Sequence, residues 1–259
     1  MQRGICLLSV VPCRKEPSGT SEMVTQLLFG EHYTIVEQKD DWFQITTAID
    51  NYTCWLSGKQ HTKLSEQSFQ KLQNADVFFA GDVIAVLTDE QKNSRFPLTM
   101  GAVLPNLKNN RLQFDDRSFT FDGTVVSASS KPVAGSIIET AFALLNAPYL
   151  WGGRTAFGID CSGFTQLVYK LNGLQLPRDA YQQVELGHPL SFVEEAEAGD
   201  LAFFDNEEGR IVHVGILLDQ HQIIHASGCV RVDKYDHYGI FNGDTGKYSH
   251  SLRVIKRVF

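Results

Sequence analysis

Short apolar runs separated by turn residues fill the chain up to about residue 125. The runs are CLLSVV, HYTIVEQ, WFQITTA and YTCWL, followed by VFFAGDVIAVL, PLTMGAVL, RLQF and SFTF. Strands of this length and spacing are typical of small β-barrels rather than of βαβ units. The polar stretch 63–76 separates the two sets, and the small, Pro-terminated stretch 126–132 follows the second set as a linker. We therefore expect two small β domains, at residues 1–66 and 67–130.

After residue 133 the apolar residues follow the period of a helix. From Ile137 to Leu145 they recur at helical spacing, and Pro148 ends that pattern. A second apolar stripe begins at Phe164 and ends before Gly173. Three strand candidates follow, at 200–205, 210–219 and 221–227. Helices followed by antiparallel strands predict an α+β domain over residues 131–259.

The first apolar run, from Ile5 to Val11, is at the short limit for the core of an export signal. No A-x-A cleavage site follows it, and Pro12 with the turn residues after it suits a first β-strand that leads into a loop. We therefore expect a cytoplasmic protein. Removal of an export signal from the N-terminus would instead indicate the periplasm.

Composition narrows the classes of partner. The chain has 259 residues and a net charge of −7, without the clustered Lys and Arg of a nucleic-acid-binding protein. No uncharged apolar run reaches the roughly 18 residues that a membrane span needs. The 5 cysteines include no CxxC pair, and their odd number does not suit a disulfide framework. These features predict neither nucleic acid nor a membrane as a partner, and they favour a neutral or cationic small substrate.

Cys161 differs from the other cysteines in what surrounds it. Asp160 suits the N-cap of the helix that carries the second apolar stripe, which places Cys161 in the first helical turn. Unpaired amides and the positive end of the helix dipole stabilise a thiolate there, and the thiolate is the nucleophilic form. The same amides can hold a developing oxyanion. Cys161 is therefore the candidate nucleophile.

A cysteine nucleophile needs a base, and the last two strand candidates carry one histidine each. His213 shares a strand face with Gly215, which leaves room beside it. If the hairpin pairs Gly215 with His225, both imidazoles lie on one face and diagonal to each other. That register needs an odd loop or a bulge, because a two-residue loop would place them on opposite faces. We then expect His213 to be the base and His225 to orient it.

Other interpretations of these three residues are open at this point. A buried cysteine is most often a small core residue, and a strand histidine is most often a hydrogen-bonded core residue. A zinc site would use the same residue types, but a cysteine at a helix N-terminus before a packing stripe lacks the usual ligand spacing. We predict no metal and no other cofactor.

The order of several short segments resembles that of the NlpC/P60 cysteine peptidases. The segments are PYLWGG (148–153), GIDCSGF (158–164), LPR (176–178), AGDLAFF (198–204), HVGILL (213–218) and IIHAS (223–227). The resemblance covers residues 133–230 and implies a papain-like fold with a triad of Cys161, His213 and His225. It also implies that the Tyr149 hydroxyl reaches toward the nucleophile as an oxyanion donor. The histidines that match nothing catalytic, and are predicted to be surface or structural, are His188, His221, His237 and His250.

The N-terminal region resembles a bacterial SH3-like (SH3b) domain. The ordered matches are CRKEPSGTSEMVTQLLFGE (13–31), DDWFQI (40–45) and NYTCWL (51–56), with Asn51 and Cys54 where glycines are usual. The strand pattern of residues 67–130 predicts a second SH3-like barrel. The expected fold is therefore α+β, with a papain-like NlpC/P60 catalytic domain preceded by two small SH3-like β-barrels.

One departure from the family pattern concerns substrate choice. Many members read Arg-Thr-Ser where this chain reads Arg178-Asp179-Ala180, and this resembles the γ-D-glutamyl-L-diamino acid endopeptidases, or dipeptidyl-peptidase VI. Those enzymes act on murein peptides with a free N-terminal L-Ala, so Asp179 is implied to pair with the substrate ammonium and measure out a dipeptide. Asp179 equally suits the N-cap of a following helix. The other substrate-binding residues implied by the resemblance are Asp160, Ser162, Trp151 and Ala180, with Glu16 and Tyr52 from the first SH3-like domain.

The predicted reaction is hydrolysis of the bond between D-Glu and the diamino acid of a murein peptide. It releases L-Ala-D-Glu, in peptidoglycan turnover or recycling, and the diamino acid is meso-diaminopimelate or Lys. Two alternatives are a general hydrolase that cuts intact stem peptides of the wall and a non-enzymatic wall-binding protein. The sequence indicates no oligomeric state.

Overall fold

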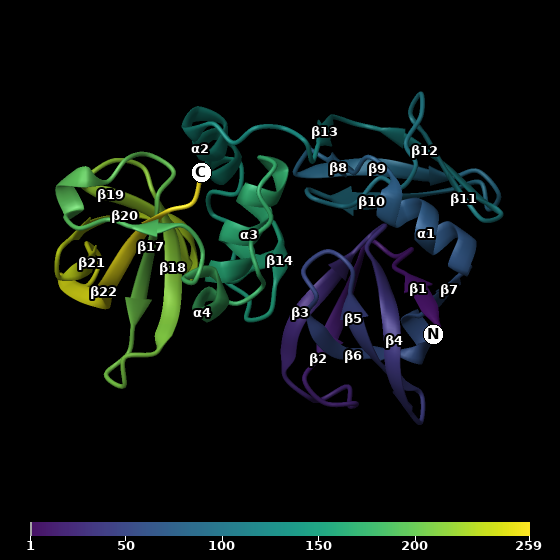
Figure 1. Cartoon of the computed structure of the whole chain (residues 1–259), viewed down its shortest axis with the longest axis horizontal. Helices are drawn as coiled ribbons and strands as arrows, with labels where there is room; N and C mark the ends of the chain where they lie inside the picture. Colours follow the sequence, from purple (N-terminus) through teal and green to yellow (C-terminus); the bar gives the residue numbers. More distant parts are fainter. Residues whose placement is uncertain (1) are drawn as a thin grey trace. The chain divides into compact units, whose positions relative to one another are not determined.

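The computed structural model describes residues 2–259. The chain divides into two compact units, with the boundary between Ser130 and Lys131 (Figure 1). The division lies within the stretch 126–132 that the sequence predicts as a linker. Strands make up most of the first unit, whereas the second unit has helices followed by strands. The change of hydrophobic period after residue 133 therefore coincides with the change of unit.

The first unit begins with an antiparallel sheet in the strand order β3-β2-β6-β5-β4-β1-β7. Its strands are β1 (Arg3–Ile5), β2 (Val10–Arg14), β3 (Met23–Leu28), β4 (His32–Lys39), β5 (Trp42–Thr47), β6 (Thr53–Ser57) and β7 (Thr62–Leu64), with the 3-10 turn η1 (Gly58–Gln60) before β7. Alternate residues of β2, such as Val11 and Cys13, are buried, because successive side chains of a strand point to opposite faces. They form one core with Tyr33, Ile45 and Leu56.

The single strand predicted from Ile5 to Val11 is wrong. The structure has two strands there, and Pro12 lies inside the second, β2, rather than in a loop. β2 pairs along its length with β3 but meets β6 only at Arg14. On its β6 side, β2 therefore makes no strand pairing near residue 12. Proline, which has no main-chain N–H, is tolerated at such a position.

The polar stretch 63–76, predicted as a connection, contains the helix α1 (Glu66–Asn74). The Ser65 hydroxyl caps it by accepting the Ser68 N–H at 3.1 Å. Phe69 and Leu72 are the only residues of this helix that are both apolar and buried. Two apolar positions are too few to reveal a helical period in the sequence. Both pack into a core that also holds residues from before and after this helix, among them Ile5 and Phe119.

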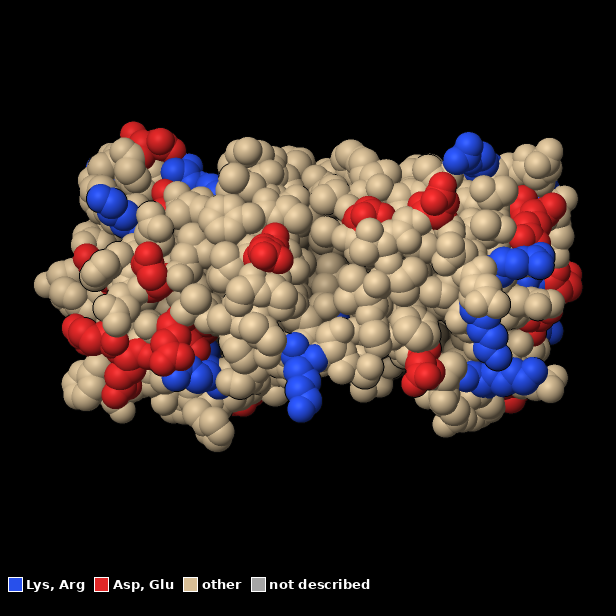
Figure 2. Space-filling model, turned by 90° about the horizontal axis from the view of Figure 1, so that it is seen from above, with Lys and Arg blue, Asp and Glu red and all other residues tan. Residues whose placement is uncertain are grey.

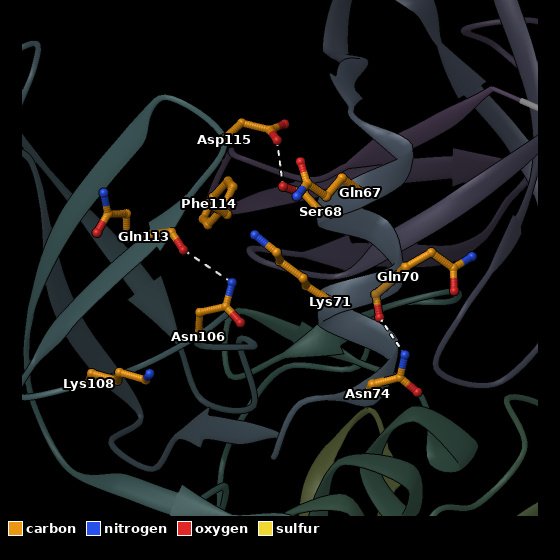
Figure 3. Close-up of a pocket in the computed structure, with 10 residues that line it drawn as sticks. All are labelled: Gln67, Ser68, Gln70, Lys71, Asn74, Asn106, Lys108, Gln113, Phe114 and Asp115. Atoms are coloured by element: carbon orange, nitrogen blue, oxygen red, sulfur yellow. Dashed lines mark hydrogen bonds between the residues drawn. The ribbon is translucent and has the colours of Figure 1, made fainter.

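The rest of the first unit has a second antiparallel sheet, in the order β10-β9-β12-β11, and a separate pair of β8 with β13. These strands are β8 (Phe78–Ala80), β9 (Ile84–Asp89), β10 (Ser94–Thr99), β11 (Arg111–Phe114), β12 (Arg117–Asp122) and β13 (Val125–Ser127). A polar groove lies between α1 and the region of β11 (Figure 3). Its described lining includes Gln70, Lys71, Asn106 and Gln113 and none of the predicted site residues.

The second unit has its helices first and then antiparallel strands, which confirms the predicted α+β order. The elements are α2 (Ala134–Phe142), β14 (Arg154–Thr155), β15 (Gly158–Ile159), α3 (Cys161–Leu171), α4 (Ala180–Gln183), β16 (His188–Pro189), the 3-10 turn η2 (Val193–Glu195), β17 (Leu201–Asp205), β18 (Ile211–Leu217), β19 (Gln222–Ser227), β20 (Cys229–Asp236), β21 (Gly239–Asn242) and β22 (Lys247–Arg257). The main sheet has the order β16-β22-β17-β18-β19-β20-β21, and β22 also pairs with β21. The strands β17 to β22 therefore close into a ring.

Helix α3 packs on β18 and β19 of this ring. Its predicted apolar stripe, which includes Phe164, Leu167 and Val168, is buried, as are Val214 and Ile224 of the two strands. The helix ends as predicted before Gly173, whose φ of +80° allows the Leu174 N–H to return to the Tyr169 carbonyl at 3.0 Å. The start of α3 is thereby held against the strands that carry the two predicted catalytic histidines.

The surface carries mixed charge. Figure 2 shows one face, on which Lys and Arg side chains lie in small groups beside Asp and Glu side chains. Such mixing does not favour a polyanion as a partner. Among the helices in the described part of the chain, none has both the length and the apolar character needed to cross a membrane.

Candidate active site

Cys161 is the first residue of α3, as predicted, and its side chain is 6% exposed. The Asp160 carboxylate caps the helix by accepting the Gly163 N–H at 2.7 Å. The main-chain N–H groups of Val214 and Ser162 lie near enough to the thiol to lower its pKa. The Val214 contact places the sulfur against β18, next in sequence to His213.

Burial raises the pKa of the Cys161 thiol to about 12, the Asp160 charge raises it further, and the Val214 and Ser162 amides lower it. The amides at the helix terminus therefore favour the thiolate, as expected, but burial opposes it more strongly. Loss of hydration destabilises the charged form of a buried sulfur by more than the nearby amides stabilise it. The free site holds a neutral thiol, and the thiolate must form as the reaction begins.

His213 on β18 and His225 on β19 are joined by a hydrogen bond of 2.8 Å between His213 Nε2 and His225 Nδ1. The register that this requires is confirmed, since Gly215 pairs with His225 and Leu217 with Ile223. At Gly215 an added Cβ would lie 2.8 Å from the His225 Cβ, so glycine does provide the room beside the imidazoles. The two rings are nearly perpendicular, at 86°.

Burial, and after it the neighbouring imidazoles of His225 and His250, hold the pKa of His213 well below its usual value. The His213 ring is therefore neutral at neutral pH and can accept a proton. A neutral thiol beside a neutral imidazole suits general-base catalysis, in which His213 takes the thiol proton as the sulfur attacks.

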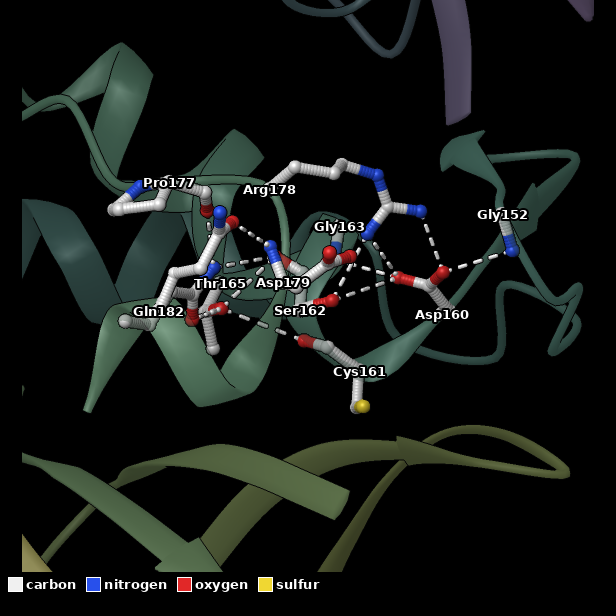
Figure 4. A network of polar contacts seen from close by, with 11 residues as sticks. Gly152, Asp160, Cys161, Ser162, Gly163, Thr165, Pro177, Arg178, Asp179 and Gln182 are labelled. Carbon is white, nitrogen blue, oxygen red and sulfur yellow. Dashed lines mark hydrogen bonds and ion pairs between the residues drawn. The ribbon is translucent and has the colours of Figure 1, made fainter. Parts of the chain in front are cut away.

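A buried ion pair holds the start of α3 in place (Figure 4). Arg178 is 1% exposed, and its two terminal nitrogens donate to the Asp160 carboxylate at 3.0 and 2.6 Å. Asp160 also accepts the Gly152 N–H at 2.8 Å, and Arg178 donates to the Ser162 hydroxyl at 2.9 Å. The side chains of Asp160 and Ser162 are thus bonded within the domain. The predicted contact of Asp160 and Ser162 with substrate stays a prediction.

Two aromatic side chains, Tyr149 and Trp151, come from the loop before the nucleophile. Tyr149 lies close enough to Cys161 for the sulfur to influence its hydroxyl, and burial, followed by Cys161 and Asp160, raises the pKa of Tyr149 to about 12. The hydroxyl therefore keeps its proton and can donate it. Trp151 is 58% exposed in the loop before the nucleophile. Its role as a wall of the substrate pocket stays a prediction.

Asp179 is the half-buried N-cap of α4, next to Arg178 in sequence. Its main-chain N–H donates to the Gln182 Oε1 at 3.2 Å, so the capping interpretation of the sequence is confirmed. Its carboxylate also bonds the hydroxyl of exposed Tyr181, which, after burial, raises the pKa of that tyrosine. Ala180 begins the helix and is buried. A cap and an ammonium site are compatible roles for one carboxylate.

Comparison with known proteins places this geometry in a family. Residues 146–245 match the NlpC/P60 family, and residues 13–60 match the bacterial dipeptidyl-peptidase Sh3 domain. The γ-D-glutamyl-L-lysine dipeptidyl-peptidase of Bacillus subtilis is 30% identical over 217 residues, 78% of this chain and 71% of that protein. The chain belongs to the NlpC/P60 family. The protein of the same name from Bacillus cereus is 28% identical over 234 residues, 81% of this chain and 68% of that one.

A solved structure of the NlpC/P60 family has the same fold. The crystal structure of a family member from Bacillus cereus matches with a TM-score of 0.84 at 21% identity, over 98% of this chain and 99% of that chain. The present chain is thus an NlpC/P60 cysteine peptidase with an SH3-like domain. Cys161, His213 and His225 are the candidates for its peptidase site.

The structure adds two residues to this NlpC/P60 site that the sequence did not indicate. Asp233 on β20 lies 3.0 Å from His225 Nε2, through its Oδ2. Because β19 and β20 pair His225 with Arg231, alternation along β20 could have placed Asp233 on the His225 face. His250 on β22 stacks on His213, which gives the histidine predicted as surface or structural a packing role at the site itself. No local signal marks it, because β22 joins β17 through closure of the ring.

The substrate-binding role of Glu16 and Tyr52, the two site residues predicted from the first unit, stays a prediction. Glu16 is exposed in the turn after β2, where its N–H donates to the Ser21 hydroxyl at 3.0 Å. Tyr52 is half-buried before β6 and packs on the core of the first sheet. Across residues 2–259, no group of three or more His, Cys, Asp and Glu side chains has the arrangement to hold a metal ion.

Proposed function

We propose that this NlpC/P60 peptidase hydrolyses the bond between D-Glu and a diamino acid in murein peptides that have a free N-terminal L-Ala. The observation that carries the proposal is the hydrogen bond of 2.8 Å between His213 and His225, on strands against which the thiol of Cys161 lies near the Val214 amide. Two Bacillus relatives, named γ-D-glutamyl-L-lysine dipeptidyl-peptidases, support the substrate class. Lys and meso-diaminopimelate both satisfy the proposal.

The proposed reaction starts from a neutral Cys161 thiol and a neutral His213 imidazole. His213 removes the proton of the Cys161 thiol as the sulfur attacks the γ-carbonyl carbon of D-Glu. The imidazolium then gives that proton to the amine of the diamino acid as the carbon–nitrogen bond breaks. Water, deprotonated by His213, hydrolyses the thioester and releases L-Ala-D-Glu with the thiol restored.

Charge that develops on the carbonyl oxygen needs donors near the sulfur. The main-chain amides at the start of α3 are such donors, and the protonated Tyr149 hydroxyl is another. One donor of this kind is worth about 10²- to 10³-fold in kcat. Tyr149→Phe should therefore lower kcat while leaving substrate affinity nearly unchanged.

The free amine of L-Ala would bind the Asp179 carboxylate. The chain at residue 178 is tied to the residue before the nucleophile by the ion pair of Arg178 with Asp160, so Asp179 is held in a fixed place in the domain. A carboxylate fixed relative to the thiol can select for the distance between the ammonium and the scissile bond. Trp151 and Ala180 would line the same end of the pocket.

The decisive experiment compares L-Ala-γ-D-Glu-meso-diaminopimelate with its N-acetylated form, with products identified by mass. The proposal expects L-Ala-D-Glu from the free peptide alone, no product with Cys161→Ala, and a raised KM for the free peptide with Asp179→Asn. Glu185→Gln, an exposed carboxylate just after α4, is the matched control and should behave as wild type. Equal cleavage of both peptides would remove the amine pocket and favour a general hydrolase of intact wall peptides.

The organisation around the peptidase is part of the same proposal. Residues 1–66 and 67–130 would form two SH3-like barrels, and Glu16 and Tyr52 of the first would contribute to substrate binding. A preference for free L-Ala suits murein fragments in the cytoplasm, since that amine is blocked in intact wall. Loss of the amine preference in a Glu16→Gln, Tyr52→Phe double variant would support the barrel's contribution, and an unchanged preference would refute it.

A further inference from the structure

Three buried side chains form a continuous hydrogen-bonded line behind the candidate nucleophile. His213 Nε2 lies 2.8 Å from His225 Nδ1, and His225 Nε2 lies 3.0 Å from Asp233 Oδ2. All three residues are buried, so water does not compete for these contacts. The line leaves one ring nitrogen of His213, Nδ1, outside these contacts.

Strand pairing holds Asp233 in this place. β19 and β20 pair His225 with Arg231 and Ile223 with Asp233, so His225 and Asp233 are diagonal neighbours on one face. Arg231 contacts both Asp233 oxygens, at 2.9 and 2.8 Å, and its other nitrogen contacts exposed Asp244 at 2.8 Å. The carboxylate is therefore held by Arg231 as well as by His225.

The charge of Asp233 decides where protons lie along the line. Burial raises the pKa of this carboxyl, but hydrogen bonds from His225 and Arg231 outweigh it and hold the pKa below the usual value. An ionised carboxylate only accepts hydrogen bonds, so His225 Nε2 must carry a proton. In the neutral imidazole Nδ1 is then bare, and it accepts the Nε2–H of His213.

We propose that Asp233 is a positioning residue of the peptidase, which selects the tautomer of His213 whose bare Nδ1 can take the proton of Cys161. The inference rests on the proposed roles of Cys161, His213 and His225. Without Asp233, neutral His225 can place its proton on Nδ1 and donate it to His213 Nε2. The His213 proton then sits on Nδ1, and the ring cannot act as a base toward the sulfur.

The test compares Asp233→Ala with Asp244→Ala, which removes the exposed partner of the same arginine. General-base catalysis is worth about 10²- to 10⁴-fold, so a partial loss of the correct tautomer should lower kcat about 10- to 100-fold with KM within about twofold. Asp244→Ala should leave both constants unchanged. Asp233→Asn keeps an acceptor oxygen and should recover part of the loss.

A spectroscopic measurement tests the tautomer directly. In the wild-type protein labelled with ¹⁵N-histidine, His213 should show the shift of an unprotonated Nδ1 and a protonated Nε2. The reverse pattern in wild type would overturn the inference without any variant. In Asp233→Ala the reverse pattern should appear in a detectable fraction, and an unchanged His213 pattern would also overturn it.

The failure of this inference is distinct from failure of the proposed function. Turnover that persists in Cys161→Ala would remove the nucleophile and, with it, the line behind it. An inactive Cys161→Ala variant together with wild-type kcat in a folded Asp233→Ala variant would leave the proposed function in place and overturn the role of Asp233 alone.

Discussion

The ring of His250 stacks on the ring of His213, with 4.0 Å between the centroids and 23° between the planes. His213 is thus held by a hydrogen bond that its edge donates to His225 and by the flat contact of His250 on one face. The Ser249 hydroxyl lies 2.8 Å from His250 Nδ1 and orients the stacked ring in turn. The position of the candidate base therefore depends on three strands, β18, β19 and β22.

Replacement of His250 should separate packing from charge. His250→Phe keeps an aromatic face and should leave kcat close to wild type. His250→Ala removes a contact worth about 0.5–1.5 kcal/mol for an aromatic pair, which corresponds to about a 2- to 10-fold loss in kcat. Steady-state kinetics on the free peptide measure both. Equal loss in the two variants would show that the imidazole itself, rather than its shape, is required.

His250 should also make the fold sensitive to acid. Burial lowers the pKa of His250 to about 4, against about 6.5 for an exposed histidine. The unfolded chain binds the proton more readily, so this contribution to stability is complete above pH 6.5 and is lost as the pH falls toward 4. The loss is at most about 3 kcal/mol. Urea unfolding of His250→Phe should show a shallower decline over this range than wild type, whereas exposed His188→Gln should show the wild-type decline.

The lowered pKa of His213 and the raised pKa of Cys161 predict the pH dependence of the chemistry. His213 must be neutral to act as a base, so the acid limb of kcat/KM should lie below pH 6.5. Alkylation of Cys161 by iodoacetamide should rise steadily with pH through the neutral range. A rate that is high and constant from pH 5 to 8 would indicate a preformed thiolate–imidazolium pair and contradict the neutral site.

Removal of one partner of the buried ion pair should be costly. Arg178→Met leaves the Asp160 carboxylate buried without its partner, which typically destabilises a protein by about 3–5 kcal/mol. The urea midpoint of the variant should fall accordingly, and thiol alkylation should become faster as the start of α3 loosens. Arg253→Met removes an exposed arginine 3.8 Å from Asp205 and should leave the midpoint unchanged.

Two glycine substitutions should have opposite effects. At Gly215 a Cβ would lie 2.8 Å from the His225 Cβ and 2.7 Å from Ile223 Cδ1, so Gly215→Ala should displace His225 and lower kcat by at least about 10-fold. At Gly135 in α2 nothing lies within 4 Å of the added atom. Gly135→Ala should therefore stabilise the helix by about 0.5–1 kcal/mol and leave kcat unchanged. Wild-type kcat in Gly215→Ala would show that the hairpin can absorb the methyl group.

Local features of the site could be predicted from the sequence. The N-cap at Asp160 and the first-turn position of Cys161 follow from neighbouring residues, and the shared face of His213 and His225 follows from strand parity and one assumption about the loop. The protonation state of Cys161 could not be predicted, because it depends on burial by β18. His250 was missed because it meets His213 only through closure of a ring between strands distant in sequence.

The same distinction applies to the first unit. The short strands were recognisable from alternation, but α1 shows only Phe69 and Leu72 to the core and reads as a polar connection. Asp233 lies between these cases. The face on which Asp233 lies could be predicted once the β19–β20 register is known. That register depends on the turn that pairs Ser227 with Cys229, and this turn could not be predicted from the sequence.

In the ion pair of Asp160 with Arg178 the two residues cannot exchange places, because one accepts hydrogen bonds and the other donates them. Asp160 accepts main-chain protons from Gly152 and Gly163 in addition to those of Arg178. An arginine at position 160 could accept none of them, so exchange of the two residues, which preserves net charge, would not preserve the site. Position 178 therefore requires a side chain that donates hydrogen bonds. Position 160 requires one that accepts them, because an acceptor there caps the helix that presents the nucleophile.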